Sequence, residues 1–130
     1  MRILLDTHTF LWFIGGHASL SAAARAAIED PAADVFVSVA SAWELAIKVG
    51  TGKLTINRPS VAVFVEEAMA GAGLDYLRIE PAHVFRVATM PMHHRDPFDR
   101  LLVAQALEEN MPLVSREAVA FSPYGVTLLW

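Results

Sequence analysis

The sequence predicts an α/β protein whose mainly parallel sheet is covered by helices on both faces. Short apolar runs alternate with longer segments of helical pattern, as in strand–helix–strand units. Strands of a parallel sheet are buried on both faces and therefore read as continuous apolar runs. A chain of 130 residues has room for one core, so we expect a single domain over residues 1–130.

The expected strands are short and apolar. The first is Ile3-Leu4-Leu5, which Asp6 closes, and the second is Val35-Phe36-Val37. In chain order the strands are residues 3–5, 35–37, 76–79, 113–114 and 126–129.

The expected helices lie between these strands, and glycine and proline mark several of their ends. Gly15 and Gly16 break the first helix, Pro31 stops the alanine-rich second one, and Gly71 follows the fourth. In chain order the helices are residues 10–14, 19–30, 40–49, 59–70, 81–89, 97–110 and 117–121.

Composition excludes several classes of protein. Hydrophobic residues make up 55% of the chain and charged residues 18%, which excludes disorder. The absence of cysteine excludes disulfides, thiolate catalysis and zinc–sulfur sites. The longest stretch without charge contains His, Gly, Ser and Thr and is a poor membrane span, and Asp6 interrupts any export signal. We therefore expect a cytoplasmic protein that has no membrane association.

Three acidic residues fall where strands of such a sheet end, and a fourth can join them. Asp6 follows the first strand, Glu44 lies early in the helix after the second, and Glu117 comes two residues after Ser115. The carboxyl ends of parallel strands share one edge, where ligands bind. Asp99, in the first turn of its helix, joins them if the loop at residues 90–96 carries that turn to the same edge.

Carboxylates gathered in this way repel one another. Two unit charges roughly 5 Å apart interact by about 3 kcal/mol at an effective dielectric near 20. Either some of them bind protons or a cation sits among them. Oxygen ligands without cysteine favour Mg²⁺ or Mn²⁺, ions that activate water and stabilise charge on a phosphate.

Each acid also has a structural interpretation. Glu44 has capping-box spacing from Ser41 and ion-pair spacing to Lys48. Asp96 is an expected N-cap, with Asp99 at the third helical position. Glu117 suits the N-terminus of any helix. Asp6 could cap the helix that follows it, but Thr7 or Thr9 would also serve, so Asp6 has the weakest structural explanation.

The aromatic and histidine residues have structural interpretations as well. Trp12, Trp43 and Trp130 are typical of a core or an interface, and His93-His94 of a solvated loop.

Four segments, in this order, resemble the PIN-domain family, and specifically the VapC-like ribonuclease toxins of prokaryotic toxin–antitoxin pairs. They are LLDTH at residues 4–8, SVASAWELAIK at 38–48, HRDPFDRLLVAQA at 94–106 and PLVSRE at 112–117. The Trp-Glu and Asp-Pro-Phe-Asp-Arg segments are the most specific. The resemblance extends over residues 2–130.

The resemblance implies a five-stranded parallel sheet in a three-layer α/β/α sandwich. It also implies an endoribonuclease with a Mg²⁺ or Mn²⁺ site built by Asp6, Glu44, Asp99 and Glu117. Of these, Asp6 and Asp99 match the acids that most directly hold metal, and Glu44 matches the acid that completes the site. The implied partners are an RNA substrate, a second copy of the chain and a cognate antitoxin whose tail enters the active-site groove.

Further residues match the family pattern with smaller implied roles. Thr7 and Ser115 match hydroxyl residues that hydrogen-bond within the acidic pocket, and Asp96 is a candidate extra acid. Glu117 departs from the pattern, because the matching position is usually Asp. The longer side chain would reach the metal differently or only through water.

The net charge of −4 gives no broad basic surface for RNA. The four site acids, however, account for all of that charge, so the rest of the chain is formally neutral. Arg95, Arg100 and Arg116 flank the acidic segments and are candidates for contacts with RNA phosphates.

Three other classes of protein compete with a nuclease. A haloacid-dehalogenase-type phosphatase needs a second acid two residues after Asp6, where this chain has His8, and a phospho-acceptor receiver domain needs an acidic pair that is not evident. A PIN-like binding module without catalysis would act only through its protein partner. The Glu117 departure favours the module, and the intact set of Asp6, Glu44 and Asp99 favours the nuclease.

Overall fold

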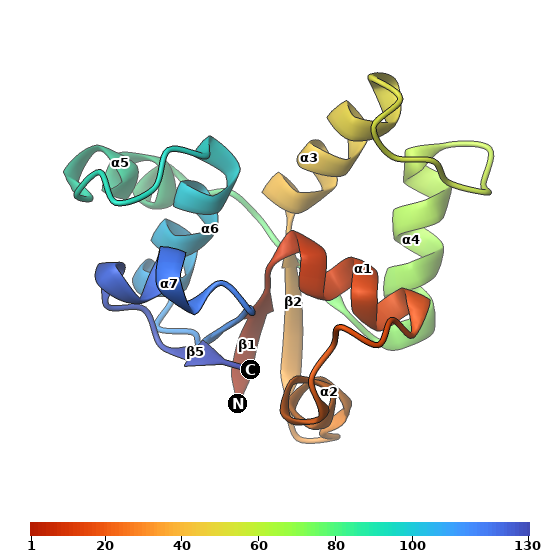
Figure 1. Ribbon diagram of the computed structural model, residues 1–130, viewed down its shortest axis with the longest axis horizontal. Coiled ribbons are helices and arrows are strands. Elements are labelled where there is room, and N and C mark those ends of the chain that lie inside the picture. The colour runs from red at the N-terminus through yellow and green to blue at the C-terminus, as the bar shows by residue number, and fades with distance from the viewer.

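Five parallel strands form one sheet in the order β3-β2-β1-β4-β5, with helices on both faces (Figure 1). The computed structural model describes residues 1–130. This architecture confirms the predicted α/β class and the three-layer sandwich. The strands are β1 (Arg2–Leu5), β2 (Asp34–Ser38), β3 (Asp75–Leu77), β4 (Leu113–Val114) and β5 (Leu128–Leu129).

All expected helices are present, and most of their ends shift by a few residues. A 3-10 turn, η1 (Ser122–Tyr124), follows the last α-helix. The α-helices are α1 (Thr7–Gly15), α2 (Ala22–Glu29), α3 (Val39–Gly50), α4 (Val61–Ala72), α5 (Pro81–Thr89), α6 (Pro97–Glu108) and α7 (Ala118–Phe121).

Two shifts have clear causes. Helix α1 begins three residues earlier than predicted, because Asp6 caps it by accepting a hydrogen bond from the backbone N–H of Thr9. Helix α4 continues through Gly71 and ends only at Gly73, which adopts the left-handed conformation with φ of 67°. The first shift matters for function, since it places Thr7 and His8 on a helix rather than in a loop.

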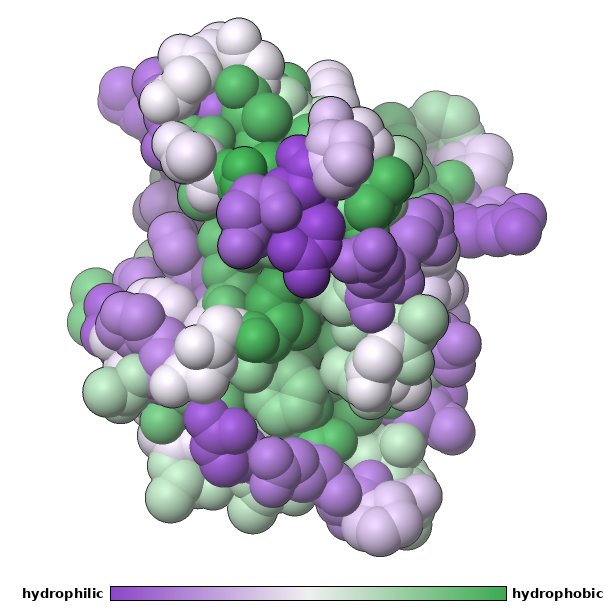
Figure 2. Space-filling view, turned by 90° about the vertical axis from the view of Figure 1, so that its right-hand side faces the viewer, coloured by the Kyte–Doolittle hydropathy of each residue, from purple (hydrophilic) through white to green (hydrophobic).

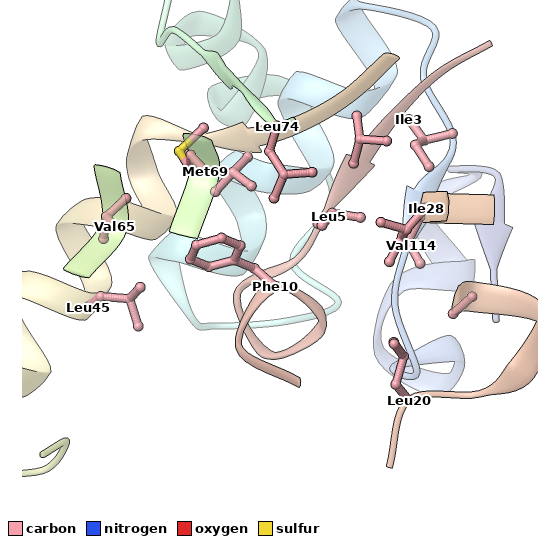
Figure 3. Packing of buried hydrophobic residues seen from close by; sticks show 13 residues of the cluster. Ile3, Leu5, Phe10, Leu20, Ile28, Leu45, Val65, Met69, Leu74 and Val114 are labelled. Atoms are coloured by element: carbon pink, nitrogen blue, oxygen red, sulfur yellow. The ribbon is translucent and has the colours of Figure 1, made fainter. Parts of the chain in front are cut away.

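Alternate residues of β1 face the two layers. Ile3 and Leu5 pack on the side of α1, α2 and α4, together with Phe10 and Met69 (Figure 3). Leu4 faces the opposite side, where the buried residues of α6 and α7 form a second cluster. Helix α5 packs against α6 as an outer element of that layer.

The register of the sheet brings the site together. Leu5 pairs with Val37 on one side and with Val114 on the other, so β1, β2 and β4 end side by side. Asp6 follows directly after Leu5, and helix α3, which carries Glu44, follows directly after β2. No helix of the structure combines the length and the apolar character needed to cross a membrane.

Candidate active site

The structure brings all four predicted acids to one pocket at the carboxyl edge of the sheet. The pocket has a volume of about 240 Å³, and Ala120 is the one hydrophobic residue among the ten that line it. We call it the acidic pocket; its lining residues are Asp6, Thr7, His8, Glu44, Lys48, His94, Asp96, Asp99, Glu117 and Ala120.

Asp6 is held rigidly at the base of the pocket. The residue is 5% exposed, and Oδ1 accepts the backbone N–H of Thr9 at 2.8 Å. The Thr9 hydroxyl in turn donates to the carbonyl of Val114 at 2.9 Å, which ties the start of α1 to β4. The N-cap therefore occupies one carboxylate oxygen of Asp6 and fixes the orientation of the carboxylate.

Glu44 has partners from two helices. The Thr7 hydroxyl donates to Oε1 at 2.7 Å and lies 2.9 Å from the Ser41 hydroxyl. Lys48, one turn along α3, places Nζ 3.2 Å from Oε2. Thr7 thus lies where the resemblance implied, and Lys48 supplies a positive charge inside the acidic pocket.

Asp99 is paired with a histidine. His94 Nε2 lies 2.8 Å from Asp99 Oδ2, and the backbone N–H of Asp99 donates to Asp96, which caps α6. Burial raises the pKa of Asp99, and the charges of Asp96 and Glu44 raise it further, although the hydrogen bond and charge of His94 oppose them. The pocket therefore disfavours an additional negative charge at Asp99.

Glu117 and Ser115 are arranged differently from the other site residues. Glu117 is exposed at the start of α7, and its side chain caps nothing. The buried Ser115 hydroxyl accepts the backbone N–H of Glu117 at 3.0 Å. Ser115 therefore shapes the turn that carries Glu117 to the pocket, while the Glu117 carboxylate stays free.

The chemistry of the lining residues fits a hard cation, but their present arrangement does not form a finished binding site. Carboxylate oxygens without thiolates are the donors that Mg²⁺ and Mn²⁺ prefer. No three His, Asp or Glu side chains are placed to hold one ion together. Instead Glu44 contacts Lys48 and Asp99 contacts His94, so binding an ion would require these pairs to open.

The three candidate arginines have different surroundings. Arg100 is buried, and its guanidinium donates to the carbonyls of Pro91, Val87 and His94, an arrangement that speaks against the expected phosphate contact. Arg95 is exposed on the loop before α6. Arg116 is also exposed and lies over the ring of Trp12.

Sequence reasoning did not assign His94 and Lys48 to the pocket. The pair His93-His94 was expected to be a solvated loop, but His94 contacts Asp99. Lys48 was interpreted as the partner of an ordinary exposed pair, and its spacing of four residues from Glu44 was the available signal. Only tertiary structure shows that both side chains face the same pocket.

Two apolar surfaces adjoin this region. On α3, the exposed side chains of Val39, Trp43 and Ile47 follow one another at single-turn spacing, and Phe98 of α6 meets Trp43 edge to face at 4.9 Å. We call these four residues the Trp43 patch.

The second apolar surface is a groove of about 490 Å³ between α1 and α4, which contains Leu11, Ile14, Phe64 and Ala68. On the molecular face that carries α4, Figure 2 shows hydrophobic side chains gathered in a hollow with polar residues at its border.

The chain belongs to the PIN-domain family, because the family model for the PIN domain matches residues 3–122. This match confirms the resemblance found in the sequence. No curated protein matches the sequence.

Several solved structures share the fold. The VapBC2 complex from Rickettsia felis, bound to a DNA fragment from its promoter, superposes with a TM-score of 0.75 at 15% identity, over 98% of this chain and 97% of that one. FitAcB from Neisseria gonorrhoeae gives 0.65 at 19% identity, over 98% and 96% of the two chains. VapBC-1 from nontypeable Haemophilus influenzae gives 0.68 at 13% identity, over 98% and 96%. At these identities the comparison shows a common fold.

Proposed function

We propose that this protein is a Mg²⁺- or Mn²⁺-dependent endoribonuclease, the toxin of a toxin–antitoxin pair. The observation that carries the proposal is the acidic pocket, where five carboxylates meet at the carboxyl edge of a PIN-domain sheet. Perturbed acids gathered in a cleft are typical of catalytic sites. The VapC-like sequence motifs and the shared fold of the VapBC and FitAcB structures support the toxin assignment.

In this proposal Asp6, Glu44 and Asp99 would hold the ion. When bound, the ion lowers the pKa of a water molecule and stabilises the charge that develops on the scissile phosphate. Asp6 would use the carboxylate oxygen that the N-cap leaves free, and Thr7 orients Glu44 toward the pocket. Glu44 or Glu117 orients the attacking water, and the exposed Glu117 carboxylate has the greater freedom to do so.

The test is cleavage of total prokaryotic RNA by the purified chain, freed of any bound partner. Reactions contain Mg²⁺, Mn²⁺ or EDTA, and Asp6→Asn runs beside the wild type. We expect discrete fragments that require the metal and disappear in the variant, and their ends would identify the substrate. Fragments that persist in EDTA or in Asp6→Asn would contradict the proposal.

A catalytically inactive binding module is the second candidate. The internal pairing of Glu44 with Lys48 and of Asp99 with His94 favours it, since these contacts give both acids a partner without any ion. A module of this kind would bind its protein partner and leave all RNA intact at every metal concentration. Divalent binding without cleavage would favour this alternative.

The proposed protein partners are an antitoxin and a second copy of the chain. The α1–α4 groove offers apolar surface to an antitoxin segment, and the Trp43 patch offers it to the second copy. The proposed RNA substrate also implies a cytoplasmic location.

Light scattering on the wild type and on Trp43→Ser/Ile47→Ser tests the dimer. We expect a dimer for the wild type and a monomer for the variant. A wild-type monomer would contradict the proposed homodimer.

A further inference from the structure

A cluster of aromatic and cationic side chains lies beside the acidic pocket. We call it the Trp12 cluster; its members are His8, Trp12, His17, Arg116 and Trp130. We propose that this cluster binds an unpaired nucleotide of the RNA next to the cleavage site, with the base stacked on the Arg116 guanidinium. The inference rests on the proposed function, because it names a feature of the substrate that the same site would take.

Trp12 is the centre of the cluster. The His8 ring stacks on it with centroids 5.6 Å apart, and the His17 ring does so at 5.8 Å. Trp130, the last residue, meets Trp12 at a steep angle at 5.9 Å, and Arg116 Cζ lies 4.7 Å from the Trp12 ring centroid. Trp12 and Trp130 also pack against the hydrophobic core, which holds the Trp12 cluster in place.

The cluster is continuous with the acidic pocket through two residues. His8 lines the pocket and stacks on Trp12 as well. Arg116 is the chain neighbour of Glu117, which also lines the pocket. A nucleotide that leaves the pocket on this side therefore meets His8 and Arg116 first.

The outward groups of the cluster are free to bind a ligand. His8, His17 and Arg116 are exposed, and Trp12 is partly buried beneath them. Arg116 forms no ion pair with any carboxylate, in contrast to Arg2, Arg25, Arg58 and Arg86. The ring of Trp12 thus holds a planar cation whose charge is not neutralised by the protein.

This chemistry favours RNA over a protein partner. A guanidinium plane stacks on nucleobases and attracts phosphate at the same time, and aromatic side chains are the usual stacking surfaces for unpaired bases. The Trp43 patch on another side of the pocket has no cation over its rings and continues into aliphatic residues, which suits a protein surface. Bases inside a duplex already stack on one another, so the Trp12 cluster predicts a preference for single strands.

The test measures binding without cleavage. The full chain carrying Asp99→Asn serves as the parent, in EDTA and at low salt, and fluorescence anisotropy follows a labelled single-stranded oligoribonucleotide of mixed sequence and the same strand in a duplex. Arg116→Lys keeps the positive charge but removes the planar guanidinium group on which a base would stack. Arg25→Lys is the matched control, because Arg25 of α2 also lies over an aromatic ring, that of Phe13, but does not line the acidic pocket.

We expect Arg116→Lys to weaken single-strand binding by roughly 10-fold and duplex binding by less than about 2-fold, whereas Arg25→Lys changes neither. Urea midpoints equal to that of the parent verify the fold of both variants. Unchanged single-strand binding in Arg116→Lys would overturn the inference and leave the cluster as packing or as a protein-binding surface. Equal losses for single strand and duplex would also overturn it, since they indicate a phosphate contact alone.

The two proposals fail in distinguishable ways. If RNA binding depends on Arg116 but the wild type shows no metal-dependent cleavage, the nuclease proposal is rejected and RNA binding by the Trp12 cluster is retained. If the wild type cleaves RNA in a metal-dependent way but Arg116→Lys leaves RNA binding unchanged, the nuclease proposal is retained and RNA binding by the Trp12 cluster is rejected. A parent that binds no single-stranded RNA would contradict this inference even if the wild type cleaves RNA.

Discussion

Two polar clusters of this protein differ in how their charges are balanced. The acidic pocket holds five carboxylates against one lysine and two histidines. Between β2, α5 and α6, Ser38, His83 and Gln105 are buried almost completely, and we call them, together with Glu109, the Gln105 network.

The Gln105 network satisfies its own groups. Gln105 Oε1 accepts the Ser38 hydroxyl, and its amide donates to the carbonyl of Arg78 at 3.3 Å. His83 Nδ1 accepts the backbone N–H of Glu80 at 2.9 Å, which places the ring proton on Nε2, 2.9 Å from Glu109. No buried side-chain polar atom of the protein lacks a partner.

The difference separates stability from function. A buried polar network whose members all have partners holds α5, α6 and β2 together and needs nothing from outside. Surplus negative charge in a pocket lowers the stability of the fold. Such a surplus is typical of a site that binds a cation. Substitutions in the two clusters should therefore have opposite consequences.

The largest effect is expected at Asp99. Asp99→Asn keeps the shape of the side chain but removes a proposed metal ligand, so the rate of RNA cleavage should fall by at least about 100-fold. Circular dichroism should show an unchanged fold. Cleavage at a rate close to that of the wild type would show that Asp99 does not act in the reaction.

The next effect is expected in the Gln105 network. Gln105→Leu removes the acceptor of the buried Ser38 hydroxyl proton and the side-chain donor to the Arg78 carbonyl, and should lower the free energy of unfolding by about 1–3 kcal/mol. Urea denaturation measures this loss, while cleavage per folded molecule should stay constant. A fall in cleavage without a fall in stability would contradict the assignment of the Gln105 network to stability and of the acidic pocket to function.

A smaller effect is expected at Glu109, whose pKa the hydrogen bond from His83 lowers despite partial burial. The lowered pKa stabilises the fold above the ordinary pKa of the carboxyl, and this contribution is lost as the pH falls through the folded-state pKa. Because its side chain is 31% exposed, Glu109→Gln should cost under about 1 kcal/mol at pH 7. A cost that stays equal below pH 4 would contradict the role of its charge.

The smallest effect is on stability at Asp99, and its sign is opposite. Burial raises the pKa of Asp99 in the folded state, so its contribution to stability is greatest at low pH and declines as the pH rises through and above its ordinary range. Asp99→Asn should therefore show a slightly higher urea midpoint than the wild type at pH 7, and the difference should shrink toward pH 4. A lower midpoint at pH 7 would mean that the contact with His94 outweighs the repulsion.

The sequence predicted the sheet and the positions of the acids because both depend on local signals. Apolar runs such as residues 3–5 mark buried strands, and an acid directly after such a run lies at the carboxyl edge. The position of Asp99 could not be predicted from local signals alone, because only the folded loop at residues 90–96 shows that the start of α6 reaches that edge.

The other contacts depend on tertiary structure. Arg100 has the sequence context of a surface cation, yet its guanidinium is buried against backbone carbonyls. The contact of His94 with Asp99 depends on how the loop before α6 folds, and the stack of Arg116 on Trp12 joins distant segments whose approach no periodicity encodes.

The most direct test of the central claim is a calorimetric titration of the metal-free protein with Mn²⁺. If the surplus charge of the acidic pocket is held for a divalent cation, the wild type binds Mn²⁺ saturably. Asp6→Asn and Asp99→Asn should then bind it at least about 10-fold more weakly, and Gln105→Leu should bind it as the wild type does. Equal affinity in all four proteins, or no binding by the wild type, would contradict the claim.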